Sequence, residues 1–523
     1  MASNNYKGVV AAGHKETVAA AELILSEGGN AFDAVIGAFF TACVAEPVLA
    51  SLGGGGFLLA HRPQHAPRLY DFFVQTPRRK RPQNDLDFYP IVADFGTTTQ
   101  EFHIGMGSIA VPGAVRGMFE IHRDLGSMPL GEIIQPAIVS AREGVRMNAL
   151  QSYIFDVVGA IYRSGADSFA TFRSATDIAR LIGEDEWLRL PVFADFLEVL
   201  AREGDRLFYE GEVAQHLIRD CAQHGGQLSA EDMRRYRVEQ RTPLHLSYHS
   251  AQILTNPPPS CGGLLIAFAL RLLEGADIAA KGFGSHHHLA VLAHAMAVTN
   301  KARIDADLHH RHHAPDIERI LVDPFIDAYR DEVLDRATFT RGTTHISVMD
   351  RNGGVASMTV TNGEGCGYLI PHTGVMLNNM LGEEDLHPMG FHRWQCDQRI
   401  TSMMAPTVLL DPAHGVVACG SGGSNRIRTA ILQFLINTID FGMDLEEAVN
   451  APRIHFENGR LSSEPGFAAG VLGELESDYQ ESQRWEQQNL FFGGIHAVKE
   501  SPCGHMLSGF GDPRRGGIAK LVH

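Results

Sequence analysis

Two short alternating segments separated by Asn-Gly are the feature that most constrains the fold of this chain. The segments are THISVMD at residues 344–350 and VASMTVT at residues 355–361, and Asn352-Gly353 lies between them. Alternation around Asn-Gly is typical of a β-hairpin, because this dipeptide favours the type I′ turn that joins two antiparallel strands. The sequence therefore predicts a hairpin over residues 343–361.

The position of the turn sets which residues of the hairpin face each other. If the turn is centred between residues 352 and 353, Thr344 faces Thr361 and Thr343 lies opposite Asn362. Hydroxyl groups and an amide should then converge at one end of a sheet, although they lie far apart in the sequence.

Thr343 follows Gly342, and this pair indicates a possible site of self-cleavage. A threonine in mid-chain is a poor nucleophile, but an N-terminal threonine has its own α-amine, with a pKa of about 7.7 to 8.0, as a base. Gly342 leaves its carbonyl unhindered for attack by the Thr343 hydroxyl. The alternative is that these threonines are ordinary β-formers at the start of a strand, and the hairpin alone favours this alternative.

The rest of the chain alternates helical and strand-like patterns. Residues 15–48 read as helical with a break near Gly28-Gly29, and the second half is apolar on all sides, which predicts a buried helix. Short β-branched strands dominate after residue 343, followed by a helix over about 424–441. This mixture predicts a layered α/β fold.

Charge and cysteine usage limit the classes of partner and the compartment. The formal net charge is −17, which argues against nonspecific binding to nucleic acid or anionic membranes. Seven scattered cysteines without C-x-x-C pairs favour free thiols in a reducing compartment. With neither a signal-peptide pattern nor a long apolar run, we expect a cytoplasmic protein.

Ten blocks of the sequence, in order, resemble the γ-glutamyltranspeptidases (glutathione hydrolases) of the N-terminal-nucleophile hydrolase superfamily. In chain order the blocks are EGGNAFDAVIGAFFTACVAEP, GGGGFLL, VPGAVRG, NPPPSCGG, TTHISVMDRNGGVASMTVT, LNNMLGEEDL, SMMAPT, GSGGSNRI, NAPRIH and GDPRRGG. The resemblance covers most of the chain. It implies a four-layer αββα sandwich made from one precursor. Cleavage would give a large subunit, 1–342, and a small subunit, 343–523, which remain together as one αββα unit.

The resemblance also implies roles for named residues. Thr343 would be the nucleophile, and Thr361 would hydrogen-bond it and assist both processing and activity. Gly422 and Gly423 would donate backbone N–H groups to the oxyanion of the tetrahedral intermediate. The implied reaction is acyl transfer from a γ-glutamyl amide, through a Thr343 ester, to water or another amine. No cofactor or metal is implied.

Several positions depart from the family pattern where the acyl group would bind. Glu383 stands at the usual position of an aspartate, Met380 replaces a polar residue, and Gly363 replaces an asparagine, for which Asn362 could substitute. The usual Ser-Ser pair is Ser402-Met403.

The arginine that would bind the substrate carboxylate is not determined by the sequence. Arg78 and Arg81 are the candidates in a basic stretch, and the other basic residues there fit a solvated surface equally well.

Three functions remain open at this stage. The first is a γ-glutamyl hydrolase or transferase that acts on a glutathione-like small molecule. The second is an acylase of the cephalosporin/glutaryl type, and the third is a non-catalytic relative.

Histidine-rich stretches at 285–295 and 309–313 lack metal-ligand spacing, so we interpret them as packing or surface histidines. A homo-oligomer is possible.

Overall fold

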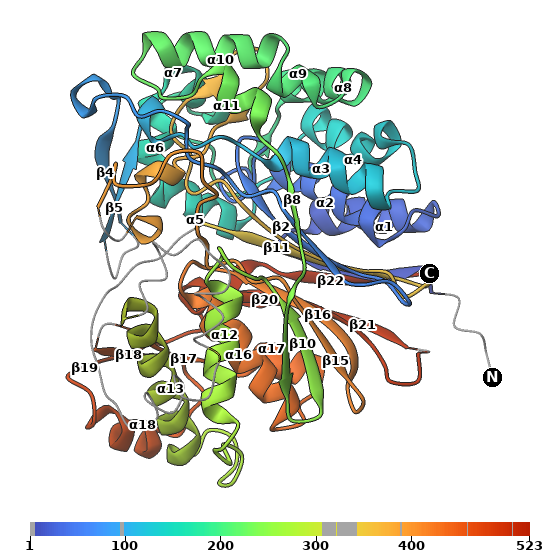
Figure 1. Cartoon of the computed structure of the whole chain (residues 1–523), viewed down its shortest axis with the longest axis vertical. Coiled ribbons are helices and arrows are strands. Elements are labelled where there is room, and N and C mark those ends of the chain that lie inside the picture. Colours follow the sequence, from blue (N-terminus) through green and yellow to red (C-terminus); the bar gives the residue numbers. More distant parts are fainter. Residues whose placement is uncertain are drawn as a thin grey trace.

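The predicted hairpin lies at the centre of an antiparallel sheet in the computed structural model of this protein (Figure 1). The structure describes residues 6–94, 99–305, 321, 342–387, 390–457, 459–504 and 506–523. Within these ranges the sheet has seven strands, in the order β22-β1-β11-β12-β2-β3-β8. Their bounds are β22 Ile518–Val522, β1 Gly8–Ala12, β11 Thr344–Asp350, β12 Val355–Thr361, β2 Gly55–His61, β3 Arg68–Asp71 and β8 Glu239–Arg241.

A second antiparallel sheet lies beside the first. Its described strands run in the order β21-β20-β16-β15-β10-β9. Their bounds are β21 Leu507–Gly511, β20 Gly494–Glu500, β16 Gly415–Gly422, β15 Thr407–Asp411, β10 Ala251–Thr255 and β9 Leu244–Tyr248.

Each sheet has one face toward the other sheet and one face toward helices. In β1, Val9 and Ala11 belong to a core cluster that includes strands of the second sheet, whereas Val10 and Ala12 belong to a cluster that includes the helical residues 31–45. Successive side chains of a strand point to opposite faces, so a strand buried on both faces is apolar throughout. This explains why β1 is fully buried.

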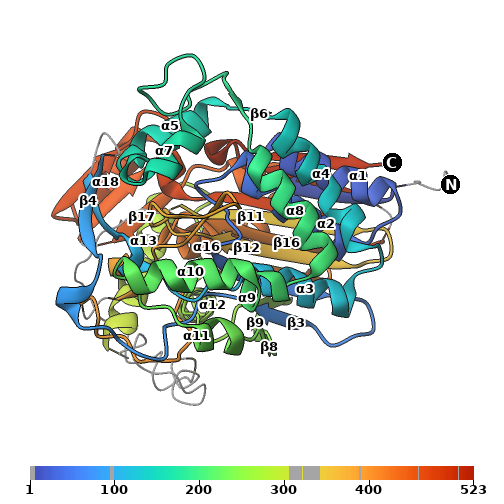
Figure 2. The same ribbon diagram turned by 90° about the horizontal axis from the view of Figure 1, so that it is seen from above.

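Helices cover the two outer faces, which completes the expected αββα sandwich (Figure 1). Helices α1 (Lys15–Ser26), α2 (Ala31–Ala45), α4 (Leu130–Glu143) and α8 (Pro191–Glu203) lie over the first sheet, as the view from above shows (Figure 2). Helices α12 (Gly262–Leu273), α13 (His286–Asp305) and α16 (Arg426–Ile439) lie on the side of the second sheet. The four-layer fold inferred from the family resemblance is therefore confirmed.

The break between α1 and α2 has a local cause. Gly28 adopts a φ of 98°, which ends α1, and Asn30 caps α2 by accepting the N–H groups of Phe32 and Asp33. Every residue of α2 is buried, as the apolar pattern predicts.

The smaller elements complete the layers. The helices are α3 Ala114–Leu125, α5 Ala149–Val157, α6 Gly159–Ser164, α7 Ala166–Phe172, α9 Arg206–Tyr209, α10 Glu212–Gln223, α11 Ala230–Arg235, α17 Leu445–Asn450 and α18 Ala469–Glu476. The strands are β4 Tyr89–Asp94, β5 Thr99–Ile104, β6 Val145–Arg146, β7 Trp187–Leu188, β13 Leu369–Ile370, β14 Val375–Met376, β17 Ile454–Glu457, β18 Arg460–Ser463 and β19 Glu481–Arg484. Within the described ranges, no helix has both the length and the apolar character that crossing a membrane requires.

The segments before and after Gly342 are interleaved in both sheets. The first sheet takes β1, β2, β3 and β8 from the earlier segment and β11, β12 and β22 from the later one. The second sheet takes β9 and β10 from before and the other four strands from after. Neither segment forms either sheet alone, so a chain cut at Gly342-Thr343 would keep a shared core.

Candidate active site

The hairpin exists, but its register differs by one residue from the prediction. Thr344 pairs with Val360 rather than Thr361, and continuing this register places Thr343 opposite Thr361. The predicted pairing of Thr343 with Asn362 was therefore wrong. The shift brings the two threonines of interest directly across from each other.

The loop of the hairpin explains the shift. Asp350 and Gly354 bond through their backbones, which leaves a three-residue loop over residues 351–353. Only Gly353 in this loop has a positive φ, of 77°, whereas a type I′ turn needs two such residues. The Asp350 carboxylate accepts the N–H groups of Asn352 and Gly354 at 2.8 and 3.0 Å, which stabilises the longer loop.

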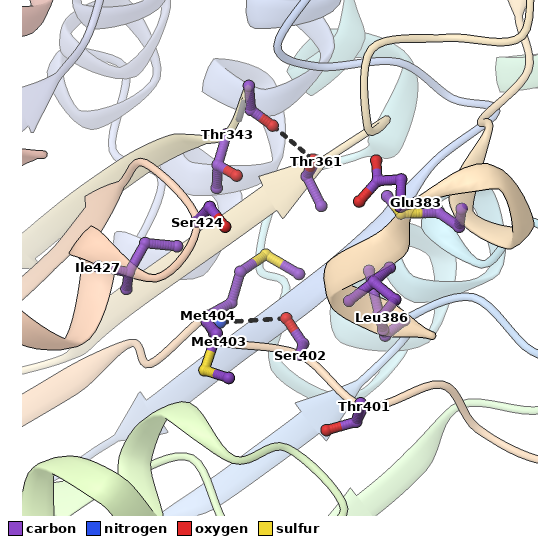
Figure 3. A pocket seen from close by; sticks show the side chains of 13 residues that line it. Thr343, Thr361, Glu383, Leu386, Thr401, Ser402, Met403, Met404, Ser424 and Ile427 are labelled. Atoms are coloured by element: carbon purple, nitrogen blue, oxygen red, sulfur yellow. Dashed lines mark hydrogen bonds between the residues drawn. The ribbon is translucent and has the colours of Figure 1, made fainter. Parts of the chain in front are cut away.

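Thr361 contacts the carbonyl before Thr343. Its hydroxyl donates to the Gly342 carbonyl oxygen at 2.7 Å, and the same oxygen atom of Thr361 accepts the N–H of Gly363 at 3.0 Å (Figure 3). A hydrogen bond to this carbonyl polarises it toward nucleophilic attack. Thr343 itself is only 4% exposed.

Three more polar contacts fix the short segment from Gly342 to Thr344. The Gly342 N–H donates to Glu364 Oε1 at 2.7 Å. Arg515 Nη1 donates to the Thr343 carbonyl oxygen at 3.2 Å, and Thr344 Oγ1 donates to Glu46 Oε2 at 2.9 Å. The peptide bond at Gly342-Thr343 is thus held on both sides by groups from distant parts of the chain.

Burial changes the acidity of two of these groups. Desolvation raises the pKa of Glu46 to about 7, although hydrogen bonds from Thr344 and Thr17 and the charge of Arg515 favour its ionised form. Desolvation also lowers the pKa of Arg515 to about 10, against the attraction of Asp512 and other carboxylates.

Gly422 and Gly423 lie where β16 ends and α16 approaches. A Cβ at Gly422 would lie 2.1 Å from the Thr343 carbonyl oxygen, so only glycine permits this approach. Gly423 has a φ of 118°. Their place beside Thr343, near the N-terminal end of α16, is compatible with the oxyanion role, which stays a prediction.

A pocket opens next to Thr343 (Figure 3). Its volume is about 40 Å³, whereas pockets for small-molecule ligands occupy roughly 300–1,000 Å³. In the intact chain this pocket is therefore much smaller than a typical site for a small-molecule ligand. Its lining residues are Phe73, Gly342, Thr343, Thr361, Met380, Glu383, Leu386, Thr401, Ser402, Met403, Met404, Ser424 and Ile427.

Glu383 is a buried carboxylate in this lining. It lies between two 3₁₀ turns, Met380–Gly382 and Glu384–Leu386. A Cβ at Gly363 would lie 2.2 Å from Glu383 Oε1 and 2.1 Å from Asn379 Oδ1. The glycine that departs from the family pattern thus leaves the space that Glu383 and Asn379 occupy.

The other predicted binding residues are divided between the pocket and its surroundings. Ser402 lines the pocket, and its hydroxyl oxygen accepts the Met404 N–H at 3.0 Å. Asn362 is fully buried and is not among the lining residues.

The two predicted arginines are engaged elsewhere in the described structure. Arg78 forms an ion pair with Asp397, and Arg81 donates to backbone carbonyls at the end of α10, including Cys221 O at 3.3 Å. Neither is in the lining, and the described lining contains no arginine or lysine.

The sequence reasoning missed three contact residues: Glu46, Glu364 and Arg515. Glu46 follows a helix of fifteen buried residues, and an acid at such a place is a signal of a buried polar site. Arg515 lies in GDPRRGG, where ion pairs are expected, and its neighbour Arg514 does pair with Glu464 at 2.6 Å. Glu364 carried no separate signal.

The described residues contain no cluster of three or more His, Cys, Asp or Glu side chains that could hold a metal ion. The histidines at 286–294 lie on α13, whereas the stretch at 309–313 lies outside the described residues.

Comparison with known proteins places this site in a family. The sequence model of the gamma-glutamyltranspeptidase family matches residues 17–522. The chain is 31% identical to the acylase ACY 1 proenzyme of Pseudomonas sp. (strain V22), over 95% of this chain and 90% of that protein. It is 28% identical to the glutathione hydrolase proenzyme of Escherichia coli (strain K12), over 94% of this chain and 87% of that protein.

Solved structures support the same fold. The cephalosporin acylase from Bacillus halodurans superposes with a TM-score of 0.85 at 23% identity and covers 98% of this chain and 96% of its own. The gamma-glutamyltranspeptidase of Helicobacter pylori superposes with a TM-score of 0.54 at 25% identity, over 62% of this chain and 91% of its own. This chain belongs to the gamma-glutamyltranspeptidase family, a family of N-terminal-nucleophile hydrolases.

Proposed function

We propose that the protein cleaves itself between Gly342 and Thr343 and then hydrolyses γ-glutamyl amides with Thr343 as its nucleophile. The observation that supports this most strongly is the Thr361 hydroxyl, which donates to the Gly342 carbonyl at 2.7 Å beside the Thr343 side chain. Two relatives that share most of the chain are named as proenzymes.

Self-cleavage would proceed through an ester. The Thr343 oxygen attacks the Gly342 carbonyl carbon, the bond from that carbon to the Thr343 nitrogen breaks, and the hydroxyl proton moves to this nitrogen. Water then hydrolyses the ester, which leaves a Gly342 carboxylate and a free Thr343 hydroxyl with its own α-amine.

The same groups would serve the substrate reaction. The new α-amine takes the proton of the Thr343 hydroxyl as it attacks the substrate amide, and the leaving amine departs protonated. Backbone N–H groups of Gly422 and Gly423 would stabilise the oxyanion, a contribution of roughly 2.7–4 kcal/mol per donor in other hydrolases. Water, or a second amine, then releases the acyl group.

Glu383 favours a γ-glutamyl group over other acyl groups. The Glu383 carboxylate lines the pocket, where it can accept hydrogen bonds from the α-ammonium of a γ-glutamyl compound. The Ser402 hydroxyl lies in the same lining and can donate to the substrate carboxylate.

A second candidate is an acylase that removes a different acyl group. It is favoured by the lining itself, in which six apolar side chains, three of them methionines, equal the polar ones in number and the described residues provide no lysine or arginine. Methionine side chains adapt to varied apolar shapes.

Two anilide substrates separate these candidates. Purified self-cleaved protein should release 4-nitroaniline faster from γ-glutamyl-4-nitroanilide than from glutaryl-4-nitroanilide, which lacks the amine. Glu383→Gln should raise the KM for the γ-glutamyl substrate about tenfold, because an ion-paired hydrogen bond contributes about 1.5–3 kcal/mol. Glu384→Gln, at an exposed neighbour, is the matched control. A wild-type preference for the glutaryl substrate would favour the acylase instead.

A further inference from the structure

In the intact chain the Gly342 end of the Gly342-Thr343 bond lines the pocket that a substrate would enter. Gly342 is one of the lining residues, and the remaining volume is about 40 Å³. If the substrate binds here, cleaving the peptide bond would not be sufficient for activity, because the new Gly342 end would also have to move away to enlarge the pocket. A side chain that promotes this departure should contact Gly342 directly.

Glu364 makes this contact. Its Oε1 accepts the Gly342 N–H at 2.7 Å, and the side chain is 2% exposed. The Glu364 N–H donates to Asn379 Oδ1 at 2.9 Å, which fixes the backbone that carries the carboxylate. Glu364 lies between Gly363 and Gly365, both at positive φ, in the loop that follows β12.

We propose that Glu364 holds Gly342 in place before cleavage and expels it afterwards. This inference rests on the proposed self-cleavage at Gly342-Thr343. The physical basis is that cleavage would replace the neutral peptide group at Gly342 with a negatively charged carboxylate, while the charge of Glu364 stays the same.

Before cleavage, Gly342 offers Glu364 a neutral N–H, which is a favourable partner for a carboxylate. Hydrolysis of the Thr343 ester adds the oxygen of water to the Gly342 carbonyl carbon and leaves a carboxylate there. That carbon is two bonds from the Gly342 nitrogen, so the new charge arises within about 5 Å of Glu364 Oε1. Two buried carboxylates at this separation repel each other, and solvent can screen them only if one moves away.

Among the described residues, Arg515 is a cation near the site, and it contacts the Thr343 side of the bond. Arg515 donates to the Thr343 carbonyl at 3.2 Å and to Leu490 O at 3.4 Å. Its guanidinium interacts with the charges of Asp512, Glu364 and Glu46, which favours ionised carboxylates around the segment. Arg515 contacts Thr343, which would become the new N-terminus and remain in the site. It therefore does not hold the Gly342 end that would depart.

The holding role is tested by the rate of self-cleavage on a denaturing gel. Glu364→Gln keeps an oxygen that accepts the Gly342 N–H and should cleave within about threefold of the wild type, whereas Glu364→Ala should be at least about tenfold slower. Equal rates for all three proteins, or a glutamine variant as slow as the alanine variant, would overturn the holding role.

The expelling role is tested with two synthetic peptides of sequence ATFTRG, residues 337–342, one ending in a carboxylate and one in an amide. The mature wild-type protein should bind the amide at least about tenfold more tightly, measured by calorimetry. In Glu364→Gln this preference should fall below about threefold. Glu46→Gln is the control: it removes another buried carboxylate that contacts Thr344 and not Gly342, and it should keep the preference.

Equal binding of the two peptides to the wild type, or the same preference in Glu364→Gln, would overturn the proposal. The comparison on the wild type requires no variant, so it stands even where a substitution disturbs folding. A wild-type chain that never cleaves would contradict the proposed function. A chain that cleaves normally but is indifferent to Glu364 would contradict this inference alone.

Discussion

Two parts of the molecule line the pocket: the segment from Gly342 to Thr344, where we propose self-cleavage, and the remaining lining residues apart from Thr361, which we call the wall. The segment is held by polar and charged groups, whereas most side chains of the wall are apolar. The wall comprises Phe73, Met380, Glu383, Leu386, Thr401, Ser402, Met403, Met404, Ser424 and Ile427. The segment from Gly342 to Thr344 is fixed by hydroxyl, carboxylate and guanidinium groups from three parts of the chain: Thr361 and Glu364 at the end of β12, Arg515, and Glu46. The facing wall is mostly apolar, with three methionines and a single carboxylate, Glu383, among its described residues.

This contrast separates the chemistry from the selectivity of the site. Attack on a carbonyl needs defined positions of donors and acceptors, and the segment provides them. Choice of an acyl group should depend on the wall, where the sequence departs from the family pattern at Met380 and Met403. Gly363 also departs from it and lies against the wall residue Glu383. Changes in the segment should therefore affect cleavage, whereas changes in the wall should affect substrate binding.

The largest effect that tests the contrast is expected at Thr361. Thr361→Ala removes the donor to the Gly342 carbonyl, and we expect self-cleavage to slow by about a hundredfold, the effect of losing one donor to a reacting carbonyl oxygen. Thr361→Ser retains the hydroxyl and should cleave much faster than the alanine variant. Time courses on a denaturing gel measure both, and equal rates for the two variants would break the assignment.

A substitution at Gly363 tests the wall. Gly363→Asn restores the residue of the family pattern, but its Cβ would lie 2.1 Å from Asn379 Oδ1 and 2.2 Å from Glu383 Oε1. Displacing these groups should destabilise the protein by about 1–3 kcal/mol and raise the KM for the γ-glutamyl anilide. Gly363→Ala introduces the same Cβ and should act in the same direction. A lower KM in the asparagine variant, measured by steady-state kinetics, would contradict this view of the wall.

Glu46 gives a pH-dependent test of the segment. Burial raises its pKa to about 7 from 4.5, so between these values the unfolded state loses a proton that the folded state keeps. Stability therefore falls as the pH rises from about 4.5 to about 7, by about 3 kcal/mol at most. Glu46→Gln removes this slope, so the melting temperature of the wild type relative to the variant should be higher at pH 5 than at pH 8. A difference that does not change with pH would contradict the burial of this charge.

The smallest effects are expected outside the pocket. Arg78 is paired with Asp397, and Arg81 is bonded to backbone carbonyls of residues 221, 222 and 226. We expect Arg78→Ala and Arg81→Ala each to change the KM for the γ-glutamyl anilide less than about twofold, since exposed ion pairs contribute little. A tenfold rise for either would restore that arginine as the partner of the substrate carboxylate.

Local patterns predicted much of the fold. The break at Gly28-Gly29, the buried helix α2 and the hairpin all follow from short-range rules, and the structure has each of them. The register does not follow from Asn-Gly alone, because the Asp350 side chain bonds two loop N–H groups and lengthens the loop. Reading Asp350 together with Asn-Gly would have indicated the three-residue loop.

The site was predictable only where its residues are close in sequence or share a family block. Thr343 and Thr361 belong to one hairpin, so their proximity followed from pairing. Glu46 and Arg515 reach the same segment from about 300 and 170 residues away, and only the packing of α2 and the chain end against β11 brings them there. No local pattern encodes such contacts.

The most direct test of the account is to determine the N-terminal sequence and mass of the fragments in purified wild-type protein, with Thr343→Ala as the control. We predict two fragments of roughly two thirds and one third of 57.1 kDa, the smaller beginning TTHIS, and one uncleaved chain for the alanine variant. A wild-type chain that stays whole, a smaller fragment that begins elsewhere, or efficient cleavage of Thr343→Ala would contradict it.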